Sequence, residues 1–241
     1  MKLCRYGKDG FEKPGMIDGE GKLRDLSKVV SSVGPNEISP RGLKMLSKVK
    51  PETLPVVSNN PRLGVPYVGI GKFVAIGLNY SDHAKEAGMP IPAEPIVFSK
   101  ATTSISGPND DVIQPKNSTK LDWEVELGVV IGAKAQYVSV DKALDFVAGY
   151  CVVNDISERA FQLATSQWDK GKGFDTAGPI GPWLVTTDEI TDPQKLDMWL
   201  DLNGNGSFSA AERIVSAVDL NTGTNLITVT IPDTATQQAV S

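Results

Sequence analysis

The stretch from Leu121 to Ile131 (LDWEVELGVVI) constrains the fold most strongly, because apolar and acidic residues alternate along it. A period of two is typical of a β-strand and places Glu124 and Glu126 on one face. The other face carries Trp123, Val125, Leu127, Val129 and Ile131. Two residues along a strand span about 7 Å, so one cation can bridge both carboxylates. Because like charges this close repel, two interpretations stand open: a solvated acidic face, or a bound divalent ion that keeps both groups ionised.

Charge and composition exclude several classes of function. The 241 residues carry a net charge of −5 and have a pI of about 5.0, so the global field does not favour nucleic acid or an anionic membrane. A single histidine excludes a multi-histidine zinc site, and two distant cysteines, Cys4 and Cys151, exclude a cysteine-rich one. Cysteine usage and the lack of a signal peptide predict a cytoplasmic protein. No apolar run approaches the roughly 20 residues of a membrane-spanning helix.

Prolines and turn residues predict two domains. Residues 1–66 read as a small α+β unit with a helix over 39–49, capped by Ser39. Its end, residues 51–66, carries four prolines and no sustained hydrophobic period, as expected of a linker. Residues 67–241 begin with short β-rich runs, which predict a larger, sheet-forming domain.

Asp155 follows the apolar strand predicted over Val147–Val153. A carboxylate at that strand end that converges with Glu124 and Glu126 completes an all-oxygen triad, the donor set that suits Mg²⁺ or Mn²⁺. The alternative is that Asp155 caps a helix, with Glu158 three residues later as its capping-box partner.

Two further segments carry candidate catalytic side chains. His83 precedes Glu86 by three residues, so the two share a face if this turn is helical. A carboxylate beside an imidazole raises its basicity, as a general base acting on water requires; an exposed helix-capping histidine is the alternative. Lys172 lies in the glycine-rich segment KGKGFDT, where a lysine either polarises an oxyanion or is solvated, as we expect of Lys170.

Several segments resemble the fumarylacetoacetate hydrolase family. They are GLNYSDHAKEAGMPIPAEPIVFSKATTSISGPNDDV, LDWEVELGVVIG, GYCVVNDISERAFQ and KGKGFDTAGPIGPW. The N-terminal runs MKLCRYG, EKPG and RDLS are similar to the bacterial acylpyruvate hydrolase and 2,4-diketo-3-deoxy-L-fuconate hydrolase subgroup. The resemblance extends from residue 1 to about Asn203, and implies an α+β fold: a mixed β-roll preceded by a small N-terminal domain, assembled as a homodimer.

The resemblance also implies roles for single residues. Those that match the family's ligands for Mg²⁺ or Mn²⁺ are Glu124, Glu126 and Asp155. Those that match its catalytic groups are His83, Glu86 and Lys172. Those that match its substrate contacts are Arg159, Gln162 and Thr176.

The implied activity is hydrolysis of a C–C bond in a small β-diketo acid, an acylpyruvate or a 2,4-diketo-3-deoxy sugar acid, through a metal-bound enolate. The expected partner is this small-molecule keto acid, and neither nucleic acid nor a membrane. Related enolate chemistry stays open, namely oxaloacetate decarboxylation, hydration or isomerisation. A metal-binding scaffold without activity is the other alternative.

The divergent tail, residues 203–241, departs from the family pattern. Of the expected glycine- and proline-rich closing loop it keeps only Thr222-Gly223-Thr224, so one wall of the pocket is expected to be incomplete. Residues 201–212 also match a calcium loop that begins at Asp201 and ends at Glu212, which makes Ca²⁺ an alternative ion. A β-hairpin turn or a chance match is the favoured interpretation of the same residues.

Replacing Glu126 with glutamine tests its predicted place among the metal ligands. An amide is a weaker ligand for a hard cation than a carboxylate, so we expect Glu126→Gln to weaken divalent binding and abolish turnover. Titration calorimetry with Mg²⁺ or Mn²⁺ measures the affinity, and tight binding retained by the variant would remove Glu126 from the ligand set.

Overall fold

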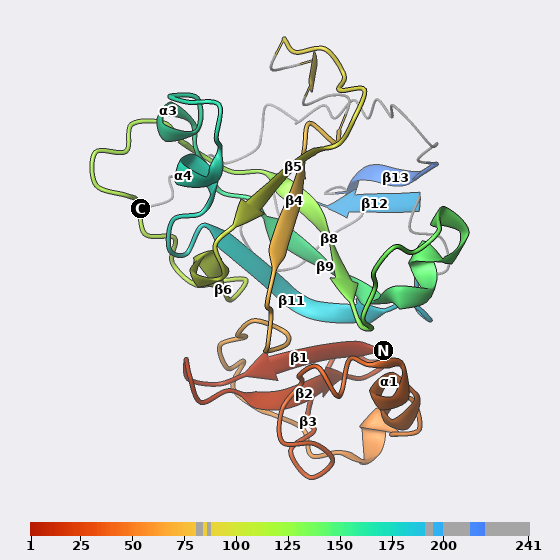
Figure 1. Cartoon of the computed structure of the whole chain (residues 1–241). Helices are drawn as coiled ribbons and strands as arrows, with labels where there is room; N and C mark the ends of the chain where they lie inside the picture. The colour runs from red at the N-terminus through yellow and green to blue at the C-terminus, as the bar shows by residue number, and fades with distance from the viewer. Residues whose placement is uncertain (81–83, 86–87, 191–194, 200–212, 220–241) are drawn as a thin grey trace. The chain divides into compact units, whose positions relative to one another are not determined.

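A mixed sheet organises the fold and connects the N-terminal strands to the centre of the chain. The computed structural model describes residues 1–80, 84–85, 88–190, 195–199 and 213–219. Within these residues, seven strands form one sheet in the order β3-β2-β1-β11-β9-β8, and β6 pairs with β11 (Figure 1). The β6–β11 pair is parallel and the other pairs are antiparallel. The strands are β1 (Lys2–Tyr6), β2 (Lys13–Ile17), β3 (Leu23–Asp25), β6 (Ile105–Ser106), β8 (Val125–Ile131), β9 (Val147–Asn154) and β11 (Gly178–Thr186).

The strand predicted over Leu121–Ile131 is divided in two by Trp123 and Glu124. Its first part, β7 (Leu121–Asp122), pairs with β10 (Ser157–Glu158), and its second part is β8. Alternation along β8 is as predicted, but the apolar row is the exposed one. The residues of this row that are 45% to 60% exposed are Trp123, Val125, Val129 and Ile131. Because Val130 is buried, the core lies on the other side of β8, which is also the side of Glu126.

Strand β1 joins the N-terminal residues to the central sheet. Leu3 pairs in register with Leu184 of β11, and both are fully buried in one apolar cluster that includes Val130. Contacts group residues 1–75 with residues 98–191 in one compact unit, and the described parts of 76–97 and 192–241 belong to a second. The predicted domain boundary at residue 66 stays a prediction.

The remaining elements are short. The predicted helix over 39–49 is confirmed as α1 (Pro40–Leu46), and the Ser39 side chain caps it by accepting a hydrogen bond from the Gly42 N–H. Residues Val140–Phe146 form a 3-10 helix. Two further pairs of strands are β4 (Phe73–Gly77) with β5 (Ile96–Lys100), and β12 (Lys195–Trp199) with β13 (Arg213–Asp219). Short 3-10 turns cover Pro51–Thr53 and Thr102–Ser104. In the described part of the chain, every helix is too short or too polar to cross a bilayer.

Arg62 ties the proline-rich segment to two distant parts of the same compact unit. Its guanidinium holds Asp110 through two contacts, Nε to Oδ1 at 2.6 Å and Nη2 to Oδ2 at 2.5 Å. The same group donates to Glu12 Oε1 at 3.0 Å and to the Gly7 carbonyl at 3.2 Å. Because these partners lie in the β1–β2 connection and in the loop after β6, one side chain fixes three segments.

Replacing Asp110 with asparagine tests this arrangement. The hydrogen bonds from Arg62 lower the pKa of Asp110. A carboxylate with a depressed folded pKa stabilises the fold above its unfolded pKa of about 3.9 and loses that contribution as the pH falls through the folded value. We expect Asp110→Asn to lower the free energy of unfolding by about 1–3 kcal/mol at pH 7. The difference from wild type should shrink as the pH falls below about 4.

Urea denaturation of both proteins between pH 7 and pH 3 measures this difference. The matched control is Asp111→Asn at the exposed neighbouring position, which should change stability by less than about 0.5 kcal/mol. A difference that stays constant across the pH range would show that the Asp110 charge is not what stabilises the fold.

Candidate functional site

The backbones of β8 and β9 bring two predicted metal ligands side by side. Val125 pairs in register with Asn154, so Glu124 and Asp155 each lie one residue beyond the paired ends. The Asp155 N–H donates to the Glu124 carbonyl at 2.8 Å, and the Glu124 N–H donates to Asn154 Oδ1 at 3.2 Å. The two carboxylates therefore converge although thirty residues of chain separate them.

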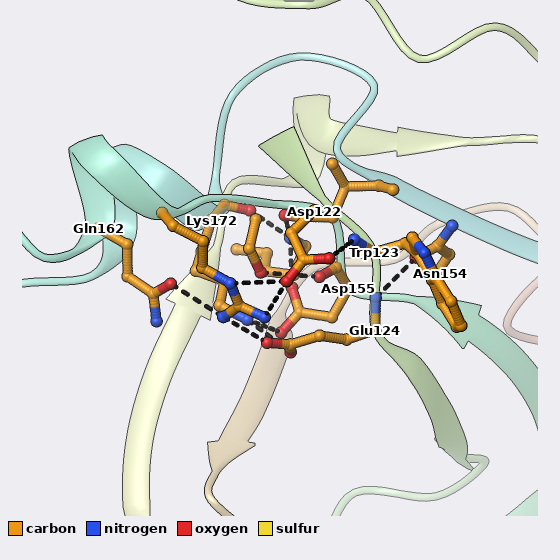
Figure 2. Close-up of polar contacts among 11 residues, drawn as sticks. Asp122, Trp123, Glu124, Asn154, Asp155, Gln162 and Lys172 are labelled. Carbon is orange, nitrogen blue, oxygen red and sulfur yellow. Dashed lines mark hydrogen bonds and ion pairs between the residues drawn. The ribbon is translucent and has the colours of Figure 1, made fainter. Parts of the chain in front are cut away.

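Lys172 lies between these carboxylates. It is the last residue of α4 (Asp169–Lys172), and its Nζ is 2.6 Å from Glu124 Oε2 and 2.7 Å from Asp155 Oδ2. Figure 2 shows the three side chains meeting at this point. Lys172 is 2% exposed, so its ammonium depends on these two partners for charge compensation. The predicted solvated residue, Lys170, is exposed.

Each of the two carboxylates also holds a second cation. Arg159 Nη1 lies 2.6 Å from Glu124 Oε1, and Lys100 Nζ lies 2.6 Å from Asp155 Oδ1. Arg159 further pairs with Asp122, at 2.8 Å from Nη2 to Oδ2. We call this alternating series the charge chain; in order, its members are Asp122, Arg159, Glu124, Lys172, Asp155 and Lys100. Its formal charges cancel in pairs, which offsets the cost of burying Lys172, Asp155 and Lys100.

Lys100 and Asp122 were not predicted from the sequence, although a signal for each exists. Phe98 and Lys100 are both buried on one face of β5. Lys100 therefore takes a position in the alternating pattern at which a buried apolar residue is expected. Asp122 is in phase with Glu124 in the alternating stretch. Burial lowers the pKa of Lys100, and the Asp155 carboxylate opposes that shift. The Lys100 ammonium also donates to the Ile156 carbonyl at 3.3 Å and to the Lys172 carbonyl.

Arg159 and Gln162 are the first and last residues of α3 (Arg159–Gln162). Arg159 Nη1 donates to Gln162 Oε1 at 3.1 Å, so these two predicted substrate contacts lie together beside Glu124. Burial acts to lower the pKa of Arg159, but its ion pairs with Asp122 and Glu124 outweigh burial and raise it. Arg159 is therefore a permanent cation at one end of the site.

Glu158, rather than Asp155, caps this helix. The chain after Asp155 first forms β10, and α3 begins only at Arg159, so the helix-capping interpretation of Asp155 is wrong. The buried Glu158 carboxylate accepts from the Phe161 N–H at 2.7 Å and from the Thr119 and Lys120 N–H groups at 2.9 and 2.6 Å. Burial acts to raise the pKa of Glu158, but these hydrogen bonds outweigh it and the pKa lies below its usual value.

Gly171 allows α4 to approach α3 closely. A Cβ atom at this buried position would lie 2.4 Å from the Gln162 nitrogen and 2.6 Å from the Glu158 carbonyl oxygen. Since both are backbone atoms, a side chain here would push α4 away. The glycine therefore determines how near Lys172 comes to the carboxylates.

Thr176 has a local structural contact. Its Oγ1 accepts a hydrogen bond from the Ile113 N–H at 2.8 Å, and its φ of 66° lies in the left-handed region. The hydroxyl thus anchors the loop before residue 115, and a role in binding substrate stays a prediction.

The fit of a metal rests on the chemistry of the donors. Glu124 and Asp155 already hold one cationic atom between them, and carboxylate oxygens are the ligands that Mg²⁺ and Mn²⁺ prefer. Glu126 is half-buried on β8 opposite Val153. Over the described residues, no group of three or more His, Cys, Asp or Glu side chains surrounds one position. Two of the three predicted carboxylates therefore offer donors of the kind that such an ion takes.

Three predictions lie outside the described residues. They are the candidate base His83, its partner Glu86 and the calcium loop at 201–212.

Replacing Glu158 with glutamine tests its part in supporting the site. The amide offers an N–H₂ group where the carboxylate accepts from backbone N–H groups, so at least one buried donor loses its partner. We expect Glu158→Gln to lower the free energy of unfolding by about 1–3 kcal/mol. The exposed Glu20→Gln should change it by less than about 0.5 kcal/mol. Urea denaturation compares the two, and equal effects would contradict the expectation.

Comparisons with known proteins agree on one family. The family model described as fumarylacetoacetate (FAA) hydrolase C-terminal matches residues 72–218. A protein of Burkholderia cenocepacia (strain HI2424), provisionally named a hydrolase, is 60% identical over 206 residues, which cover 85% of this chain and 73% of that protein.

Solved structures give the same result. Fumarylacetoacetate hydrolase from psychrophilic Exiguobacterium antarcticum has a TM-score of 0.70 and 31% identity, with 82% of this chain and 70% of that chain covered. The 5-carboxymethyl-2-hydroxymuconate delta-isomerase from Mycobacterium smegmatis has a TM-score of 0.58 and 28% identity, with 82% and 69% covered. The predicted α+β fold class is confirmed, and the chain belongs to the fumarylacetoacetate hydrolase family.

Proposed function

We propose that this protein is a divalent-metal-dependent hydrolase that cleaves a C–C bond in a small β-diketo acid, an acylpyruvate or a 2,4-diketo-3-deoxy sugar acid. The observation that carries the proposal is the convergence of Glu124 and Asp155 on one cationic position. Membership of a family whose solved relatives include fumarylacetoacetate hydrolase supports it.

Glu124 and Asp155, joined by Glu126 as proposed third ligand, would hold Mg²⁺ or Mn²⁺. When bound, such an ion supplies Lewis-acid polarisation of the keto acid end of the substrate. Arg159 and Gln162, held together at the start and end of α3, would orient the substrate carboxylate by hydrogen bonds. The Lys172 ammonium would stabilise negative charge as it develops on the substrate.

His83 is the proposed general base, and Glu86 would set its tautomer. The imidazole takes a proton from water, and the water oxygen forms a bond to the distal carbonyl carbon. The bond from that carbon to the neighbouring methylene carbon then breaks, and the methylene carbon takes up a proton. A carboxylic acid and a pyruvate-like keto acid are the products.

An isomerase of a related dienol acid is the second candidate. The structural relative from Mycobacterium smegmatis bears the name of a delta-isomerase, and this favours it. Both reactions need a bound cation beside a lysine and a base, so the charge chain serves either. Mass spectrometry separates them, because isomerisation preserves the substrate mass and hydrolysis yields two smaller acids.

We also infer a cytoplasmic homodimer. Cys4 and Cys151 are buried free thiols, as is usual in a reducing compartment. The sheet face of β8 and β9 exposes a row of apolar side chains, which supports a partner there. These are Val125, Val129, Ile131 and Val152.

Loss of acylpyruvate absorbance with Mg²⁺ or Mn²⁺ tests the proposed reaction. We expect wild type to consume the substrate only with a divalent ion, and His83→Ala to be slower by about 10²–10⁴-fold because general-base catalysis is lost. Lys170→Ala, at an exposed position beside the site, is the matched control and should retain full activity.

Two outcomes would count against the proposed reaction or against the proposed base. A wild type inert with both ions favours the metal-binding scaffold without activity. An active enzyme that His83→Ala does not impair would remove His83 as the base.

A further inference from the structure

The position that the proposed metal would take is already filled by a side chain of the protein. Lys172 Nζ lies between Glu124 Oε2 and Asp155 Oδ2 at 2.6 and 2.7 Å. These are the oxygens that face each other across the site, because Arg159 and Lys100 pair with the opposite oxygen of each carboxylate. A divalent ion that bridges the two carboxylates must therefore meet the ammonium group.

The ion and the ammonium cannot occupy this position together. Like charges at contact distance repel strongly in a buried site, where water screens them little. The outer pairs need not change, since Arg159 and Lys100 hold oxygens on the far sides of the carboxylates. The conflict is therefore confined to Lys172.

Lys172 differs from Lys100 in its place in the chain and in its partners. It ends a helix of four residues, and Gly171 and Gly173 flank it. Its ammonium lies 5.4 Å from the centre of the Phe98 ring in the same position, so the ring is a further, cation–π partner beside the two carboxylates. Lys100, by contrast, is fixed by a carboxylate and two backbone carbonyls.

We propose that the Lys172 ammonium and a divalent cation are alternative occupants of the position between Glu124 and Asp155. In the metal-free protein, Lys172 neutralises the two carboxylates and keeps them together. Binding of the ion displaces the ammonium, which is then available to the substrate. This rests on the proposed metal dependence, and it makes the lysine a catalytic group only in the loaded protein.

Chemical labelling of the full-length protein tests the displacement without measuring activity. A water-soluble acetylating reagent is applied with and without Mn²⁺, and peptide mass spectrometry follows each lysine. We expect Mn²⁺ to speed acetylation of Lys172 by about tenfold or more. The exposed Lys170 and the buried Lys100 are internal controls, and their rates should not change. Protection or an unchanged rate at Lys172, in protein shown by calorimetry to bind Mn²⁺, overturns the proposal.

The variant Lys172→Met removes the competing ammonium and keeps a long apolar stem. We expect calorimetry to give an Mn²⁺ dissociation constant about tenfold or more below that of wild type, with Lys170→Met unchanged. Mn²⁺ should also raise the melting temperature of Lys172→Met more than that of wild type, because only the variant lacks a cation between its carboxylates.

The two proposals fail in different ways. If neither wild type nor Lys172→Met binds Mn²⁺, the metal dependence is wrong. If both bind it with equal or weaker affinity in the variant, the metal dependence stands and the exchange is wrong.

Discussion

The ion pairs of Lys172 with Glu124 and Asp155 are the interaction on which the site depends. An isolated carboxylate is costly to bury, and here two lie beside each other at the ends of paired strands. The lysine between them removes that cost, and the cations on either side satisfy the remaining oxygens. Because the members come from β5, α3, α4 and the β8–β9 pair, the charge chain also joins these elements. Loss of Asp155, for example, removes the 2.6 Å ion pair of the buried Lys100.

Contacts of Glu158 and the close approach at Gly171 support the charge chain. The Glu158 carboxylate accepts hydrogen bonds from backbone N–H groups of two segments. These bonds fix the start of α3, where Arg159 lies. Gly171 lets α4 pack against α3 at backbone contact. Lys172, at the end of α4, reaches the carboxylates through a flexible four-carbon stem. Arg159 and Lys172 thus share Glu124, and each also pairs with a second carboxylate, Asp122 for the arginine and Asp155 for the lysine.

The solved structures to which this chain is similar include one named as a hydrolase and one named as an isomerase. Under either proposed reaction, the charge chain would place positive charge beside the substrate. Nothing in Glu124, Asp155 or Lys172 distinguishes water attack from proton transfer. That choice belongs to the base and to the walls that shape the substrate, and so to other parts of the chain.

The sequence by itself determined the pairing of acidic and apolar residues along β8, the strand before Asp155, the Ser39 cap of α1 and the family. These follow from local periodicity and from motifs that lie within one segment. Only the tertiary structure decided that Lys100 and Asp122 join the site, that Glu158 rather than Asp155 caps α3, and that the apolar row of β8 faces outward. Each depends on a partner from a distant segment: Lys100 lies in β5 and Asp155 directly follows β9, and the Glu158 carboxylate finds its donors at Thr119 and Lys120. A periodic pattern states that a strand has two faces, but the packing of the whole chain determines which of them is covered.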